Sequence, residues 1–266
     1  MKDIKNQQVW RIIGMFLLLL VLTACSELEL PETHFCERID TRYTVPIYLS
    51  NNSLQIKGST LADFKDLVDS IHAHRDIGDG TDYTLKAKLY IDKQCQSTRL
   101  DSLMTALRVG SIYISYFKVN IPDDSCWIMY NLGAIFPPLD SLFESQLMNP
   151  SARDSLHLTV IRLFNHDTII VNDLKTSLAS FQRNLFRQIL TQRKYSIVVL
   201  PQKQDTFGEL VRFYDIYLST VKNIRELYSV QKFGVSYKQL DEEQSAQIQR
   251  LFRRSCTIKF STIANL

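Results

Sequence analysis

The chain has 266 residues, of which 45% are hydrophobic and 22% charged. This is the composition of a globular protein, and it excludes a disordered or collagen-like chain. Eight glycines and seven prolines are few for this length, so long flexible linkers are not expected. The formal net charge is +3 and the sequence has no basic block. The chain therefore lacks the concentrated positive charge that is typical of a nucleic-acid-binding protein.

The N-terminus has the layout of an export signal. Three basic residues, Lys2, Lys5 and Arg11, come before an apolar run at 12–22. This run falls short of the about 20 residues that span a bilayer, but it is typical of the apolar core of a secretory signal peptide. We therefore expect residues 1–24 to be a cleaved signal peptide. The alternative is an ordinary apolar N-terminus.

The predicted signal ends in a motif for lipid attachment. Leu22, Thr23 and Ala24 stand directly before Cys25, and this run resembles a bacterial lipobox. The resemblance implies that Cys25 is acylated and that fatty acids such as palmitate anchor the mature chain in the cell envelope. The motif does not specify which membrane surface carries the anchor. It is compatible with the periplasmic side of the inner or outer membrane and with the cell surface. Acidic residues just after the cysteine resemble lipoprotein leaders of Bacteroidetes-type bacteria.

The first domain is predicted over residues 44–120, after an N-terminal tether at 25–43. Apolar residues alternate in its expected strands and recur every three or four positions in its expected helices. The strands are predicted at 45–49, 54–57, 83–91 and 112–119, and the helices at 61–71 and 97–107. Ser97 or Thr98 can cap the second helix, and Gly110 stands where that helix is expected to end.

A second domain with the same order is predicted over residues 156–234. Its strands are expected at 158–161, 168–171, 195–200 and 224–230, and its helices at 178–189 and 207–218. Equivalent elements lie about 110 residues apart, which indicates two copies of one domain, since solenoid repeats are about 20 to 50 residues long. The predicted fold is α+β: two tandem β-β-α-β-α-β domains, each a small sheet with two helices on one face.

Two further segments surround the second domain. The connector at 121–155 is too apolar for a free linker, and we expect it to pack on one domain with Trp127 as an anchor. The tail at 235–266 is predicted to contain a helix that opens at Asp241, followed by an edge strand at 256–263.

The repeated domain resembles the periplasmic domain of ExbD/TolR biopolymer-transport proteins. The second copy carries the resemblance, with a strand at 196–200, the acidic turn at Asp205 and a helix starting at Phe207 and Gly208. The first copy has no such aromatic-glycine pair. The resemblance implies homodimer-like pairing, here inside one chain, and an ExbB-like, TonB-like or peptidoglycan partner. The family's membrane helix carries an acidic residue, whereas the run at 12–22 has none.

Export makes the other cysteines candidates for disulfides. Cys36, Cys95, Cys126 and Cys256 allow three pairings, and we expect between zero and two bonds. Their long separations contain no C-x-x-C pair, which argues against a zinc site. A buried free thiol is the alternative for each of them.

Catalytic chemistry has little support in the sequence. His72 and His74 are two positions apart at a predicted helix end, so they point to different faces, whereas helical metal ligands are spaced by four. No phosphate-binding glycine motif is present. We therefore expect no catalytic residues, metal or cofactor, and predict a lipid-anchored binding module. A structural or surface lipoprotein and an exported hydrolase of unknown chemistry are the alternatives.

Several Asp-Ser/Thr-apolar triplets resemble an O-glycosylation signal, with helix capping as the alternative.

Overall fold

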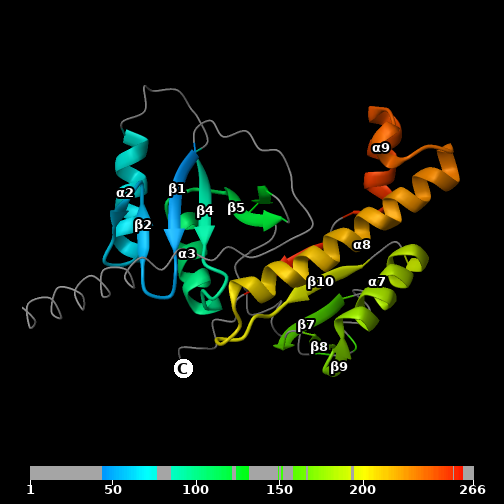
Figure 1. Ribbon diagram of the computed structural model, residues 1–266, viewed down its shortest axis with the longest axis horizontal. Coiled ribbons are helices and arrows are strands. Elements are labelled where there is room, and N and C mark those ends of the chain that lie inside the picture. Colours follow the sequence, from blue (N-terminus) through cyan, green and yellow to red (C-terminus); the bar gives the residue numbers. More distant parts are fainter. Residues whose placement is uncertain are drawn as a thin grey trace, which may run out of the picture.

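The computed structural model describes residues 44–76, 85–121, 124–131, 149, 151, 158–165, 167–192, 195–253 and 255–259, with the backbone alone for 74–76, 119–121, 124–131 and 164–165. The predicted signal peptide, lipobox and tether lie outside the described residues. Figure 1 shows two units side by side, the first coloured blue to green and the second green to red.

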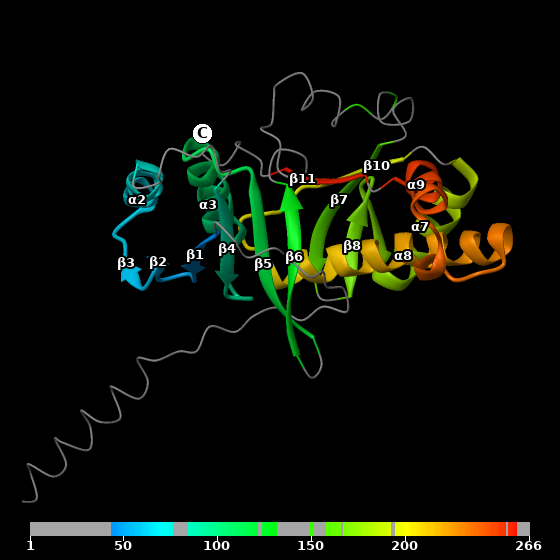
Figure 2. The same cartoon turned by 90° about the horizontal axis from the view of Figure 1, so that it is seen from above.

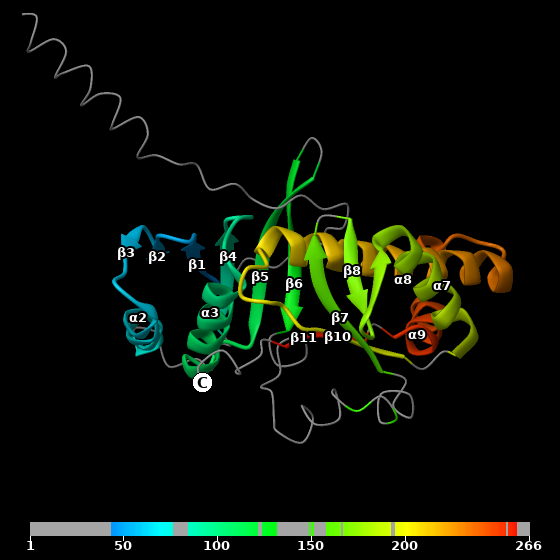
Figure 3. The ribbon, with the colours of Figure 1, turned by 90° about the horizontal axis from the view of Figure 1, so that it is seen from below.

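The first unit is a six-stranded sheet with two helices. Its elements are β1 (Thr44–Leu49), β2 (Leu54–Ile56), β3 (Ser59–Thr60), α2 (Phe64–Asp76), β4 (Lys86–Ile91), α3 (Ser97–Val109), β5 (Ile114–Ile121) and β6 (Asp124–Asn131). The strand order is β3-β2-β1-β4-β5-β6, as Figures 2 and 3 show. Strands β1, β4 and β5 are parallel to one another, and the other pairs are antiparallel.

The second unit repeats this plan with five strands. Its elements are β7 (Leu158–Asn165), β8 (Thr168–Val171), β9 (Leu174–Ser177), α7 (Leu178–Gln192), β10 (Ser196–Val199), α8 (Phe207–Phe233), the 3-10 helix η1 (Tyr237–Gln239), α9 (Glu242–Leu251) and β11 (Cys256–Ile258). The order β9-β8-β7-β10-β11 is that of the first five strands of the other sheet, and β7, β10 and β11 are parallel.

The predicted α+β class with two sheet domains is confirmed, and the order of elements is refined. Each unit has one short strand more than predicted, β3 in the first and β9 in the second. Both strands are mostly exposed. A short edge strand with one solvated face lacks the alternation of apolar residues by which strands are recognised in a sequence.

One predicted strand is wrong. Residues 224–230 belong to α8, which continues without a break to its left-handed glycine cap at Gly234. Ile224 extends the helical series of buried residues through Leu218 and Val221, so its apolar character serves the helix. The strand that completes the second sheet is β11, which the sequence analysis expected only as an edge strand of the tail.

The connector begins with a strand. Residues of β6 pair antiparallel with β5 along their whole length, and the backbone of Trp127 lies opposite Lys118. The predicted anchoring by the Trp127 side chain lies outside what the structure describes, as do nearly all residues from 132 to 157.

The main hydrophobic core runs through both units, and a small separate cluster consists of Leu158, Val160 and Val198. Alternate residues of β1, which are Val45, Ile47 and Leu49, face this core, and its other members include Leu185 of α7 and Val221 of α8. Figure 2 shows α2 and α3 on the same side of the first sheet, as predicted. Because each sheet and its helices bury residues in the same cluster, the two units pack as one body.

Candidate functional site

The two units meet through equivalent loops. The loop between β4 and α3 contains Lys93-Gln94, and the loop between β10 and α8 contains Lys203-Gln204, 110 positions later. At the end of these loops Gln96 forms an isolated antiparallel bridge with Thr206, also 110 positions away. Each residue thus pairs with its own counterpart, which is the arrangement of a local two-fold axis.

The hydrogen bonds on either side of this bridge are symmetric too. The Ser97 backbone N–H donates to the Asp205 carbonyl oxygen at 2.8 Å, and the Phe207 N–H donates to the Cys95 carbonyl oxygen at 2.8 Å. Ser97 corresponds to Phe207, and Cys95 corresponds to Asp205. The junction therefore repeats within one chain the reciprocal contact that a symmetric homodimer makes between two chains.

Close packing surrounds the bridge. The ring of Phe207 stacks on Phe117 of β5 with centroids 5.4 Å apart. The next residue, Gly208, donates its N–H to the Lys93 carbonyl oxygen at 2.8 Å, and a Cβ at this position would lie 3.0 Å from that same oxygen. A side chain at this position would push the two backbones apart by a few tenths of an ångström, and glycine avoids this shift. The aromatic-glycine pair of the sequence thus joins the two units.

The junction is chemically unequal at one symmetric position. Asp205 is buried, accepts the Gln202 N–H at 2.7 Å, and burial raises its pKa to about 6. Its counterpart Cys95 is also buried, and burial raises the pKa of that thiol to about 12. One side of the junction can therefore ionise between pH 4 and 7, and the other stays neutral.

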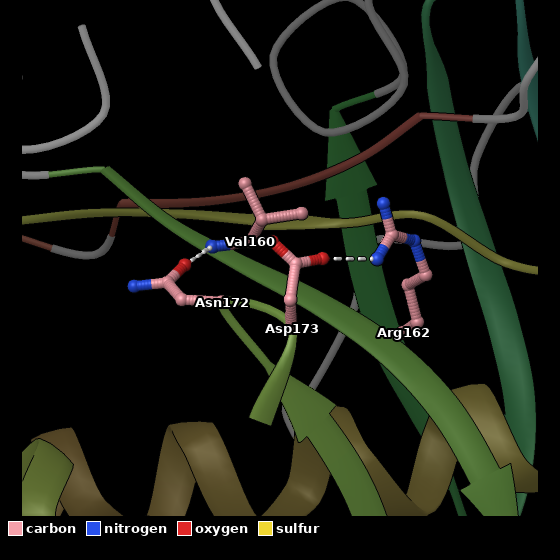
Figure 4. Close-up of polar contacts among 4 residues, drawn as sticks. All are labelled: Val160, Arg162, Asn172 and Asp173. Carbon is pink, nitrogen blue, oxygen red and sulfur yellow. Dashed lines mark hydrogen bonds and ion pairs between the residues drawn. The ribbon is translucent and has the colours of Figure 1, made fainter. Parts of the chain in front are cut away.

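The outer edge of the second sheet is held by a polar turn. Asn172 and Asp173 connect β8 to β9 with φ of +46° and +70°, a left-handed conformation that Asn and Asp tolerate. The Asn172 side chain accepts the backbone N–H of Val160 at 2.8 Å, and Asp173 accepts from Arg162 at 2.7 Å (Figure 4). These contacts fix the hairpin that presents β9.

Strand β9 ends the second sheet on the side away from β11. It contains Leu174, whose side chain is 72% exposed. The corresponding edge of the first sheet is β3, which has two residues, Ser59 and Thr60, and no apolar side chain. An exposed strand edge with an apolar residue is a template for pairing with another extended segment.

The predicted lipidation site lies outside the described residues, and so does Cys36. Two of the other candidate disulfide cysteines, Cys95 and Cys256, are buried free thiols in the structure, and burial also raises the pKa of Cys256. For Cys126 the structure gives only the backbone, in β6. Buried protonated thiols of this kind are unreactive.

In the described part of the chain, the histidines do not lie in a group of metal-binding side chains. His72 is exposed on α2, the side chain of His74 is not described, and the other three lie outside the description. Among the described residues no group of three metal-ligating side chains comes together. No helix in those same ranges is long and apolar enough to cross a membrane.

Comparison with known proteins finds no matching family model, no matching curated protein and no matching solved structure. The resemblance to ExbD/TolR domains stays a prediction. The repeat is apparent in the sequence, whereas the bridge between Gln96 and Thr206 was not predicted from it. The repeated Lys-Gln pair at an offset of 110 was the available signal for it.

Proposed function

We propose that the protein is a lipid-anchored binding module of the cell envelope. In this proposal residues 1–24 are removed on export and acyl chains on Cys25 hold the mature chain on a membrane. The module acts as an adaptor related to ExbD/TolR-type transport energisation or to cell-wall attachment. The run at 12–22 contains no ionisable residue, so we propose no proton-coupled role for it.

The observation that carries this proposal is the symmetric bridge between Gln96 and Thr206. A domain that pairs with a copy of itself normally uses its pairing surface for a second chain. Here both copies are in one chain, and their pairing surfaces are occupied by each other. A partner must then bind elsewhere, and the outer sheet edge is the surface suited to an extended segment.

Strand addition at β9 is the mode of binding that we propose. Main-chain hydrogen bonds along an exposed edge supply affinity, and side chains next to the edge supply specificity. Leu174, at the start of β9, offers apolar contact at 72% exposure, and the turn that precedes it is fixed by the Asn172 contact to Val160. The partner in this proposal is an ExbB-like or TonB-like protein, or a peptidoglycan-associated component.

Crosslinking in cells tests the partner. The full-length chain, carrying a C-terminal tag, is crosslinked, captured and analysed by mass spectrometry. Leu174→Lys is compared with the control Val109→Lys, which changes a 59% exposed valine at the end of α3. We expect an envelope partner to be captured with the parent and the control, and to be reduced with Leu174→Lys.

Other results of this experiment contradict the proposal in different ways. Equal capture with both variants rules out β9 as the docking edge. Recovery of no envelope component favours a structural or surface lipoprotein. Anchoring is tested separately by Cys25→Ser, which we expect to abolish palmitate incorporation. Palmitate incorporation at the parent level in Cys25→Ser contradicts the anchor.

A further inference from the structure

A cavity of about 300 Å³ opens between the two long helices of the second unit. Its lining consists of Gln182, Arg183, Phe186, Arg187, Thr220 and Asn223. Thr220 is buried and Phe186 is half-buried, so these two form the floor. Arg183, Arg187 and Asn223 are exposed and form the rim. The cavity thus has a partly apolar floor and a rim of hydrogen-bond donors.

The charge around this cavity is one-sided. Two guanidinium groups line it, one helical turn apart, and no carboxylate does. Helix α7 has no acidic residue at any position. Arg183 donates to the Ser180 hydroxyl at 3.2 Å, and neither arginine forms an ion pair with a carboxylate of the described residues. Two arginine side chains without such an ion pair are suited to bind the oxygens of a phosphate group.

The cavity exists where the second unit departs from the first. Thr220 corresponds to Gly110, at which α3 ends. A Cβ at Gly110 would lie 2.9 Å from Ile71 of α2, so the helices of the first unit are in close contact there. In the second unit the helix continues past this point for about three and a half further turns, and a cavity lies beside it.

An apolar stripe continues from the cavity along α8. Leu227 and Val230 follow Thr220 and Asn223 at spacings that keep all four on one helix face. Leu227 is 40% exposed and Val230 is 50% exposed. A ligand that fits this surface has an anionic group for the rim and an apolar part for the stripe. Phospholipids combine these two features.

We propose that the cavity between α7 and α8 binds the phosphate of an anionic phospholipid headgroup. Arg183 and Arg187 contact the phosphate oxygens, and Leu227 and Val230 lie against the acyl region. The inference rests on the proposed function in one respect, since an acyl anchor on Cys25 is what holds the second unit close to phospholipids. The site then orients the anchored chain, with the outer half of α8 toward the membrane.

Vesicle flotation of the full-length Cys25→Ser chain tests this site without the acyl anchor. The vesicles are phosphatidylcholine alone or phosphatidylcholine with phosphatidylglycerol. The apolar N-terminal run is present in every variant, so differences between variants report the cavity. We expect stronger binding to the anionic vesicles, and a loss on the order of tenfold in Arg183→Gln/Arg187→Gln, from the removal of two cations at the lipid surface. Leu227→Asn/Val230→Asn should weaken binding as well.

The matched control is Lys57→Gln/Lys65→Gln, which removes two exposed charges from the first unit. We expect it to change binding by less than about twofold, because non-specific attraction is shared over the whole surface. An equal loss in the control overturns the proposal in favour of general electrostatics. Binding of millimolar glycerol 1-phosphate without any preference for the anionic vesicles also overturns it, because the site is then one for soluble phosphates.

Failure of the inference and failure of the anchor are distinguishable. If Cys25→Ser loses palmitate but does not prefer anionic vesicles, the anchor stands and the phospholipid site is wrong. If the preference depends on both arginines while the parent takes up no palmitate, the phospholipid site stands and the anchor is wrong. Thermal unfolding of each variant is measured as a control. An unchanged midpoint shows that the substitutions leave the fold intact.

Discussion

The two units share one topology but differ at the end of their second helix. In the first unit α3 ends at Gly110, and the chain returns directly to β5. In the second unit α8 runs on to Phe233, and η1 and α9 follow before β11 completes the sheet. The shared part contains the symmetric junction, whereas the extension completes the cavity beside α7 and contains the exposed apolar stripe. Symmetry thus accounts for the pairing, and the departure from symmetry supplies new surface.

A second difference lies in the hairpin that leads to each edge strand. In the second unit Asn172 accepts the N–H of Val160 through its side chain. In the first unit the corresponding residues are Lys57 and Pro46, joined by the backbone bond from the Lys57 N–H to the Pro46 carbonyl oxygen at 3.2 Å. Proline has no N–H, so this turn needs no side-chain acceptor. Pro46 therefore explains why position 57 needs no side-chain acceptor, and the N–H of Val160 explains why position 172 is an asparagine.

The largest expected effect comes from breaking the junction at Phe207. Its ring is 3% exposed and stacks on Phe117 of the other unit. Phe207→Ala should lower the free energy of unfolding by about 3–5 kcal/mol, as for other buried phenylalanines, and should speed hydrogen exchange at the Ser97 amide. Urea unfolding measures the first effect. The control is Phe233→Ala, at the outer end of α8, and a loss no larger than in this control contradicts the account.

The chemical difference between Asp205 and Cys95 predicts a pH effect. Burial raises the pKa of Asp205 from 3.8 to about 6, so the folded chain binds more protons than the unfolded chain between these values. The contribution of Asp205 to the free energy of unfolding therefore falls as pH rises from 4 to 6, by about 1–3 kcal/mol. Asp205→Asn should gain in relative stability over this interval, as urea unfolding at pH 4 and pH 7 would measure. No change relative to the exposed control Glu242→Gln would argue against a perturbed carboxyl.

The entry into β11 depends on a tyrosine whose counterpart in the first unit is Leu107. The Tyr217 hydroxyl accepts the Ser255 N–H at 2.6 Å and lies 3.2 Å from the Tyr195 hydroxyl. Tyr217→Phe leaves that N–H unpaired and should cost about 1–3 kcal/mol in urea unfolding. Tyr228→Phe, a half-buried position of the same helix, serves as the control. Equal effects of the two variants would mean that the hydroxyl contact contributes nothing.

The smallest expected effect is a difference in stability between variants of the two hairpins. Asn172→Gly keeps the left-handed turn but removes the acceptor of the Val160 N–H, and should cost about 1 kcal/mol. Lys57→Gly removes no such acceptor and should be neutral or slightly stabilising, since glycine tolerates a φ of +49°. Thermal unfolding of both variants measures the difference. Equal shifts in the two units would refute the role assigned to the Asn172 side chain.

The repeat could be predicted from the sequence because the apolar spacing of the main helices and strands is clear in both copies. The third strand of each unit could not, since Leu174–Ser177 is an exposed edge with no apolar alternation. The error at 224–230 has a physical cause: Ile224, Leu227 and Val230 are compatible with either a strand or a helix. The first breaker after them is Gly234, and its distance favours a continuous helix.

The candidate sites were less predictable than the fold. The bridge between Gln96 and Thr206 depends on how two units pack, and neither polar residue indicates a partner by itself. The cavity similarly needs Arg187 on α7 and Thr220 on α8 to face each other. Local sequence sets the helices, but their separation follows from how both pack on the second sheet and from the length of α8.

The central claim is that the two units are paired with each other inside one chain, and a crosslink at the bridge tests it most directly. Gln96 and Thr206 form a non-hydrogen-bonded antiparallel pair, in which Cα atoms lie about 4.5 Å apart, close enough for a disulfide. The chain with Gln96→Cys and Thr206→Cys should form this bond within a single molecule on mild oxidation, as peptide mapping by mass spectrometry would detect. Thiols that stay reduced at both positions, or that link only between two chains, would contradict the internal pairing.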